Sequence, residues 1–181
     1  MVYVFLADGF EEIEATAPID IMRRAGLEVV TVGIGGQLVR GAHNITVMAD
    51  MDGADTTPDE TVDAVVLPGG LPGTVNLENS AVVQSFLDYA DKNGKVMAAI
   101  CAAPSVLGHK GLLNGKYAVC FPGYEKELFG AKVQKTAVEI DGNFVTACGA
   151  GAALEFGFAL VERLCDRETA KNLKQAMLCG R

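Results

Sequence analysis

Short apolar runs alternate with longer amphipathic segments along most of this chain, and this alternation restricts the fold more than any other feature. The runs are apolar on both faces and mostly rich in Val and Ile, which is typical of strands buried in a parallel sheet. They cover residues 2–7, 27–34, 63–70 and 95–100. Helices are expected between them, at 11–25, about 80–92 and 102–110. The order of strand and helix predicts an α/β fold with a mostly parallel central sheet.

Two further segments complete the expected organisation. Residues 35–51 alternate polar and apolar side chains around a bend at 41–44, which predicts a small β-hairpin insertion. Residues 143–164 repeat the pattern of strand, small-residue turn and long helix, and a last amphipathic helix is expected at about 167–178. With 181 residues and no internal repeat, the chain is expected to form a single domain over 1–181.

Charge and composition exclude several classes of protein. A net charge of -8 argues against a dedicated nucleic-acid-binding surface, which needs clustered Lys and Arg. The apolar runs are shorter than the ~20 residues that a bilayer requires, and the N-terminus lacks the basic region of a signal peptide. Five cysteines without a CxxC motif indicate neither a disulfide framework nor a zinc site. We therefore expect a cytoplasmic protein that binds no membrane.

The stretch VMAAICAAPSVLG places a single thiol, Cys101, between an expected strand and an expected helix. A nucleophile elbow places its reactive residue in such a turn, and the small neighbours allow the turn to form. Free N–H groups at the start of the helix are expected to favour the thiolate and lower its pKa. The alternative is a small buried hydrophobe; Cys165 and Cys179 are interpreted in this second way.

Neither histidine offers Cys101 an obvious base. His109 lies eight residues further along the same expected helix, about 12 Å away at 1.5 Å per residue, and is expected near its C-terminus. His43 lies at the hairpin tip and could approach only if the hairpin folds over the site or belongs to a second subunit. A Cys-His-Asp triad within one chain is therefore not indicated.

Glu14 is the better candidate to act with Cys101. It lies on the helical stripe whose other members are apolar or small, so it is expected on the buried face, where burial raises a carboxyl pKa. The alternative is an exposed acid that complements the helix dipole, which is how Glu11 and Glu12 are interpreted. Gly69 and Gly70 follow a strand, and such a pair can aim backbone N–H groups at an oxyanion, although Gly-Gly is common in loops.

These motifs together resemble the ThiJ/PfpI superfamily, in the branch of the Parkinsonism-associated protein DJ-one. The segment ADGFEEIEATAPIDIMRRAG resembles the acidic first helix of the family, VVLPGG its glycine loop, AAICAAP its cysteine elbow and TACGAGAALEFGFALVE its last strand and helix. The resemblance runs nearly end to end. It implies a flavodoxin-like three-layer sandwich that forms a homodimer.

The resemblance also implies roles for individual residues. Cys101 becomes the reactive cysteine and Glu14 the carboxylic acid that hydrogen-bonds it. Gly69, Gly70 and the amide of Ala102 become the anion pocket. The segment RGAHNITV resembles the family hairpin that reaches towards the neighbouring subunit, so His43 is expected to line the pocket of the partner.

Two positions depart from the pattern of the family. Many relatives carry a histidine before the proline that follows the elbow helix, where this chain has Phe121, and a peptidase would need that base. Close relatives have a Pro and a polar or basic residue where this chain has Ala150 and Cys148. Cys148 is therefore either a second redox thiol near the site or a buried structural cysteine.

The resemblance implies a cofactor-independent glyoxalase or deglycase, which acts through Cys101 on methylglyoxal, glyoxal or their early adducts. The alternative is an oxidative-stress sensor or redox-regulated chaperone that uses the same residues. An intracellular peptidase receives less support because Phe121 replaces the histidine base. A role in thiazole monophosphate synthesis also receives less support, since there is no phosphate-binding motif. No cofactor is expected, and no metal, because His and Cys lack ligand spacing.

Overall fold

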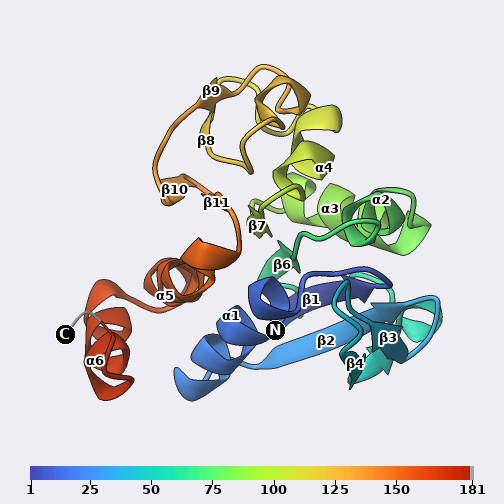
Figure 1. Cartoon of the computed structure of the whole chain (residues 1–181), viewed down its shortest axis with the longest axis horizontal. Coiled ribbons are helices and arrows are strands. Elements are labelled where there is room, and N and C mark those ends of the chain that lie inside the picture. The colour runs from blue at the N-terminus through green and yellow to red at the C-terminus, as the bar shows by residue number, and fades with distance from the viewer. Residues whose placement is uncertain (180–181) are drawn as a thin grey trace.

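The computed structural model describes residues 1–179 and confirms the α/β class (Figure 1). Its central sheet has seven strands in the order β10-β11-β7-β6-β1-β2-β5, and all neighbours are parallel except β10 and β11. The strands of this sheet are β1 (Val2–Ala7), β2 (Val29–Ile34), β5 (Met51–Asp52), β6 (Ala64–Leu67), β7 (Val96–Ile100), β10 (Val138–Asp141) and β11 (Phe144–Ala147).

Helices cover both faces of the sheet, so the molecule has three layers. Figure 1 shows α1, α5 and α6 on one side and α2, α3 and α4 on the other. The helices are α1 (Glu12–Arg24), α2 (Gly73–Glu78), α3 (Ala81–Lys92), α4 (Pro104–His109), α5 (Ala153–Leu164) and α6 (Arg167–Ala176).

The period-two geometry of the strands explains the two cores. In β1 the side chains alternate strictly between them: one core takes Val2, Val4 and Leu6, and the other takes Tyr3, Phe5 and Ala7. Strands that are apolar on both faces therefore occupy the middle of the sheet, as the sequence predicts. Their carboxyl ends meet at one edge, where ligand sites of open α/β sheets form.

The expected elements are present with small changes in their ends. The hairpin pairs β3 (Leu38–Arg40) with β4 (Thr46–Met48), and the bend lies at 41–44 as predicted. Strand β6 ends earlier than expected because Pro68 has no N–H for the ladder. Helix α4 begins at Pro104 rather than at residue 102.

Several short elements of the structure were not predicted from the sequence. These are α2, the antiparallel edge strand β10, and a two-stranded sheet formed by β8 (Tyr117–Ala118) and β9 (Lys132–Val133). Strand β10 had a usable signal, since Gly142 and Asn143 form the two-residue turn of a hairpin. Within residues 1–179, no helix has both the length and the apolar character needed to cross a membrane.

Candidate active site

Cys101 occupies a strained turn at the carboxyl end of β7. Its φ of 65° lies in the left-handed region, which costs a non-glycine residue about 1 kcal/mol or more. Neighbouring segments hold this backbone on both sides, because Cys101 N donates to the Ala147 carbonyl at 2.9 Å and its own carbonyl accepts from Phe121 N at 2.7 Å. The turn therefore presents the thiol at the ligand-binding edge of the sheet, as an elbow does.

Glu14 reaches the same place from the first turn of α1. Glu11 caps this helix, accepting the Glu14 backbone N–H at 2.7 Å. The Glu14 side chain is only 1% exposed, so its predicted burial is confirmed. Its Oε2 accepts the backbone N–H of Gly69 at 3.0 Å, and the carboxyl group also forms a hydrogen bond with the Cys101 thiol.

Burial changes the acidity of Glu14. It raises the pKa of the carboxyl from its ordinary value of 4.5 to about 7, and the Glu11 carboxylate acts in the same direction. Hydrogen bonds from Cys101 and from the Gly69 amide oppose the rise in pKa. Glu14 is therefore placed to exchange a proton at neutral pH.

The expectation of a lowered thiol pKa is wrong for Cys101. Burial, followed by the charge and hydrogen bond of Glu14, raises the pKa of this thiol to about 12. The backbone N–H groups of Ala102 and Gly70 form hydrogen bonds to the sulfur and oppose this effect without overcoming it. The resting pair is thus a thiol beside a carboxyl group that ionises near neutrality, rather than a free thiolate.

The two glycines have different tasks. Gly69 lies against Glu14 and Cys101, since a methyl group placed on it would be 2.5 Å from Glu14 Oε2 and 2.7 Å from Cys101 Cβ. Its N–H donates to Glu14 Oε2, whereas the family resemblance assigns it to the anion pocket. Gly70 has a φ of 91°, which favours glycine, and its N–H together with that of Ala102 faces the sulfur.

The hairpin folds back over the start of α1 in the same chain. His43 Nδ1 lies 2.8 Å from Glu12 Oε2, and Glu12 Oε1 accepts the His43 backbone N–H at 2.7 Å. This partner raises the pKa of the exposed imidazole. Glu12 lies in the first turn of α1, as expected, but it is only 6% exposed because the loop covers it, and the sequence did not indicate this burial.

Among the described residues, one cluster has a spacing that could hold a metal ion. It consists of Glu11, Glu12 and His43, whose candidate ligand atoms lie within 4.8 Å of one another. The hydrogen bonds between Glu12 and His43 already satisfy these groups. His109 ends α4, where it contacts Glu78 and Glu127 and not Cys101, as the sequence predicts.

The two positions that depart from the family pattern border the site. Gly149, between Cys148 and Ala150, has a φ of 156°, and a methyl group on it would lie 3.3 Å from the Phe121 ring and 3.9 Å from Glu14 Oε1. Phe121 is half-exposed and supplies no base. The wall of the site next to Glu14 is therefore formed by the Phe121 ring and by small residues.

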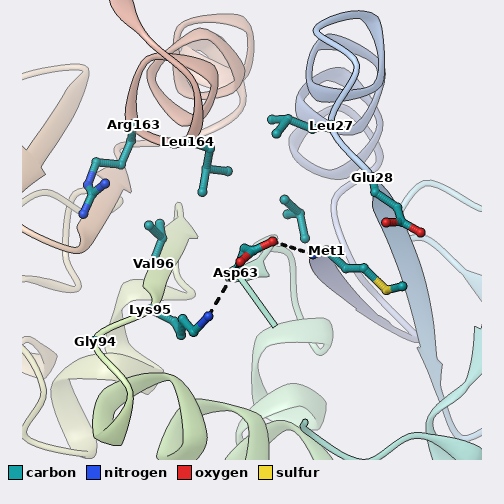
Figure 2. Close-up of a pocket in the computed structure, with 10 residues that line it drawn as sticks. Met1, Leu27, Glu28, Asp63, Gly94, Lys95, Val96, Arg163 and Leu164 are labelled. Carbon is teal, nitrogen blue, oxygen red and sulfur yellow. Dashed lines mark hydrogen bonds and ion pairs between the residues drawn. The ribbon is translucent and has the colours of Figure 1, made fainter. Parts of the chain in front are cut away.

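A separate cavity of about 370 Å³ lies at the opposite edge of the sheet (Figure 2). Its charged groups pair within the chain, since Asp63 accepts from the N-terminal amine at 2.6 Å and lies 3.6 Å from Lys95 Nζ. Arg163 donates to the Gly142 carbonyl at 2.8 Å. This cavity is lined by the amino ends of the strands and lies away from Cys101.

Comparison with known proteins identifies relatives along almost the whole chain. Protein dj-1beta of Drosophila melanogaster is 35% identical over 178 residues, which are 97% of this chain and 95% of the relative. A protein named deglycase from Pyrococcus abyssi is 33% identical over 149 residues, 81% of this chain and 88% of the relative. The chain spans less than half the length of the Arabidopsis thaliana DJ-1 homologs A and B, at 46% and 39%.

The fold comparison agrees with the sequence comparison. A structure of oxidized DJ-1 from Toxoplasma gondii superposes with a TM-score of 0.94 at 35% identity, covering 99% of this chain and 98% of that one. Drosophila melanogaster DJ-1beta gives 0.92 at 34% identity, with 99% and 98% covered. These neighbours confirm the flavodoxin-like sandwich. Since the DJ-1/PfpI family also matches residues 1–163, this chain belongs to the DJ-1/PfpI family.

Proposed function

We propose that this protein is a cofactor-independent glyoxalase or deglycase that converts methylglyoxal, glyoxal and their early adducts through Cys101. The observation that carries the proposal is the buried Glu14 carboxyl, which is hydrogen-bonded to Cys101 and has a pKa raised to about 7. A group with this pKa can accept and return protons at neutral pH. The deglycase name of the Pyrococcus abyssi relative supports an enzymatic role.

In the first step, the Cys101 sulfur attacks the aldehyde carbon of methylglyoxal while the Glu14 carboxylate accepts the thiol proton. A carbon–sulfur bond forms, and the electron pair of the carbonyl moves to oxygen. The N–H groups of Gly70 and Ala102, which act on the sulfur, are the donors that we assign to this oxygen. Glu14 then gives its proton to this oxygen, which completes a hemithioacetal and restores the carboxylate.

In the second step, Glu14 removes the C–H proton of the hemithioacetal and returns it to the neighbouring carbon. The two carbons thereby exchange oxidation levels, and the product is a thioester of lactate on Cys101. Water then hydrolyses the thioester, which releases lactate and restores the thiol. On a glycated adduct, Cys101 attacks the carbon that carries the amine or thiol, and the bond from this carbon to nitrogen or sulfur breaks. The repaired amine or thiol leaves with a proton from Glu14, and the same rearrangement and hydrolysis follow.

The test is lactate formation from methylglyoxal, without glutathione, by freshly reduced protein. We expect formation by the native chain and by a Cys165→Ser control, which replaces an exposed cysteine far along the chain, and none by Cys101→Ser. Lactate formation that survives Cys101→Ser would refute the proposal. Absence of turnover in the native chain would favour the second candidate.

The second candidate is an oxidative-stress sensor or redox-regulated chaperone. The same geometry favours it, because the Gly70 and Ala102 amides and a protonated Glu14 are suited to hold the oxygens of an oxidised Cys101. A sensor needs selective oxidation of Cys101 but no repeated turnover. The lactate measurement therefore separates the two candidates.

A further inference from the structure

A second thiol, Cys148, follows the strand that lies beside Cys101. Ala147 and Ile100, the last residues of β11 and β7, pair in parallel register, and the two cysteines directly follow this pair. Cys101 N donates to the Ala147 carbonyl at 2.9 Å. Parallel neighbours lie about 4.8 Å apart, which is within the Cα separation that a disulfide needs. The two backbones are therefore close enough to be bridged.

The side chains also share one side of the sheet. Both thiols are half-buried, and both pack against the core that faces α1 and α5. Gly149, which follows Cys148, lies next to Glu14 Oε1, so the segment that carries Cys148 borders the Cys101–Glu14 pair. Cys120 is 5% exposed and packs in the core of the opposite face, but it lines the same cavity as Cys148.

Space is available around Cys148. It lines a cavity of about 520 Å³ together with Cys120 and other residues from 119–125 and 134–137, whereas Cys101 does not line this cavity. The open space allows the Cys148 thiol to change rotamer, and it makes Cys120 the competing partner that the test has to exclude.

We propose that Cys148 is a resolving thiol, which captures the sulfenic acid of Cys101 as an intramolecular disulfide when a hydroperoxide oxidises the site. The inference rests on Cys101 being the reactive thiol of the proposed function, but it does not depend on turnover of an aldehyde. The disulfide would inactivate the Cys101 thiol reversibly when peroxide is present.

The chemistry balances in two steps. The hydroperoxide takes two electrons from the Cys101 sulfur, which gains a hydroxyl group while the peroxide is reduced to an alcohol or water. The Cys148 thiolate then attacks this sulfur, the S–S bond forms, the S–O bond breaks, and the departing hydroxide takes a proton and leaves as water. Glu14 can supply that proton, and an external dithiol can later reduce the disulfide.

The alternative fate of the sulfenic acid is a second oxidation to sulfinic acid, which dithiols do not reverse. An adjacent thiol has an effective concentration of about millimolar or more, whereas peroxide is usually far more dilute. Capture by Cys148 should therefore win at low peroxide concentration and protect Cys101.

The sequence makes the test direct, because trypsin places each cysteine in its own peptide. Cys101 lies in 96–110, Cys120 in 117–126, Cys148 in 136–163, Cys165 in 164–167 and Cys179 in 175–181. Reduced protein is treated with a slight excess of hydrogen peroxide, alkylated, digested and analysed by mass spectrometry. We expect peptide 96–110 joined to 136–163, and its separation by dithiothreitol.

The variants decide the outcome. In Cys148→Ser and Cys148→Ala, dimedone should trap the Cys101 sulfenic acid, and Cys101 sulfinic acid should increase about tenfold or more over the native chain. Cys120→Ser removes the other cysteine that lines the cavity of Cys148, and it should behave as the native chain. Circular dichroism checks that each variant is folded.

Two results would overturn the inference. One is that Cys101 oxidises to sulfinic acid at the same rate in the native chain and in Cys148→Ser, although dimedone traps the Cys101 sulfenic acid in that variant. The other is a disulfide that joins Cys148 to peptide 117–126. If Cys101 reacts with neither peroxide nor iodoacetamide in any variant, the inference and the proposed role of Cys101 fail together.

Discussion

Burial of one carboxyl group determines how the thiol at this site can react. The same desolvation raises the pKa of Glu14 to about 7 and that of Cys101 to about 12, so the sulfur keeps its proton until Glu14 can accept it. The proposed function therefore requires Glu14 to act as a base at neutral pH, in addition to the elbow turn. Loss of a general base typically reduces a rate about a hundredfold or more.

Gly69 tests how tightly this pair is packed. In Gly69→Ala, the added methyl group would collide with Glu14 Oε2 and Cys101 Cβ, and overpacking of this kind costs about 1 to 3 kcal/mol. We expect urea denaturation to show this loss, and lactate formation to fall. Gly151→Ala is the matched control, since nothing lies within 4 Å of its added methyl group. Equal stability of the two variants would contradict the packing described here.

The sequence predicts the burial of Glu14 but not the burial of Glu12, and the reason is physical. Glu14 lies on a stripe with the helical period, so its burial follows from local geometry. Glu12 is buried by the loop at 41–45, and no local pattern reports a contact with residues about thirty positions away. The prediction of a lowered Cys101 pKa was wrong for a similar reason, because desolvation depends on tertiary packing.

At the scale of elements, Glu12 fixes the hairpin on α1. Its Oε1 accepts the backbone N–H groups of His43 and, at 3.4 Å, of Ile45. Glu12→Ala leaves both donors without this acceptor, which we expect to reduce the free energy of unfolding by about 1 to 3 kcal/mol. His43→Ala keeps both backbone bonds and serves as the control. Faster hydrogen exchange at 41–45 in Glu12→Ala alone would support this role, whereas identical exchange in both variants would contradict it.

Elements with a clear period were predictable, and the shortest were not. Strands β1, β6 and β7 are continuous apolar runs, and α1 has a regular stripe, so their positions follow from the sequence. Strands β8 and β9 have two residues each, which is too short for any period. Their pairing depends on the surrounding chain.

At the scale of the whole molecule, Glu14 links stability to pH. Between its ordinary pKa of 4.5 and the folded value of about 7, the folded chain holds a proton that the unfolded chain has released. Stability should therefore fall as the pH rises through this window, by up to about 3 kcal/mol at about 1.4 kcal/mol per pH unit. Glu14→Gln should remove this part of the loss, measured by urea denaturation at about pH 5 and pH 8. An unchanged pH dependence would contradict the burial of an ionisable group here.

The proposed homodimer can be tested at the hairpin. Leu38 and Met48 face each other across β3 and β4, and they are 71% and 75% exposed, so together they form an apolar pair that a second subunit could cover. We expect the native chain to be a dimer by light scattering and Met48→Glu to be a monomer. Val75→Glu, at an exposed apolar position on α2, is the control and should remain a dimer. A monomeric native chain would contradict this proposal and the expected position of His43 in the pocket of a partner.

The central claim is that Glu14 accepts the proton of Cys101, and the rate of Cys101 alkylation by iodoacetamide as a function of pH tests it most directly. Peptide 96–110 reports the reaction at this thiol alone. In the native chain, the rate should rise through an inflection near pH 7 and then level off, because the pair loses its first proton there. In Glu14→Gln, that inflection should disappear and the rate should rise only at alkaline pH. The same profile in both proteins would show that Glu14 does not control this thiol.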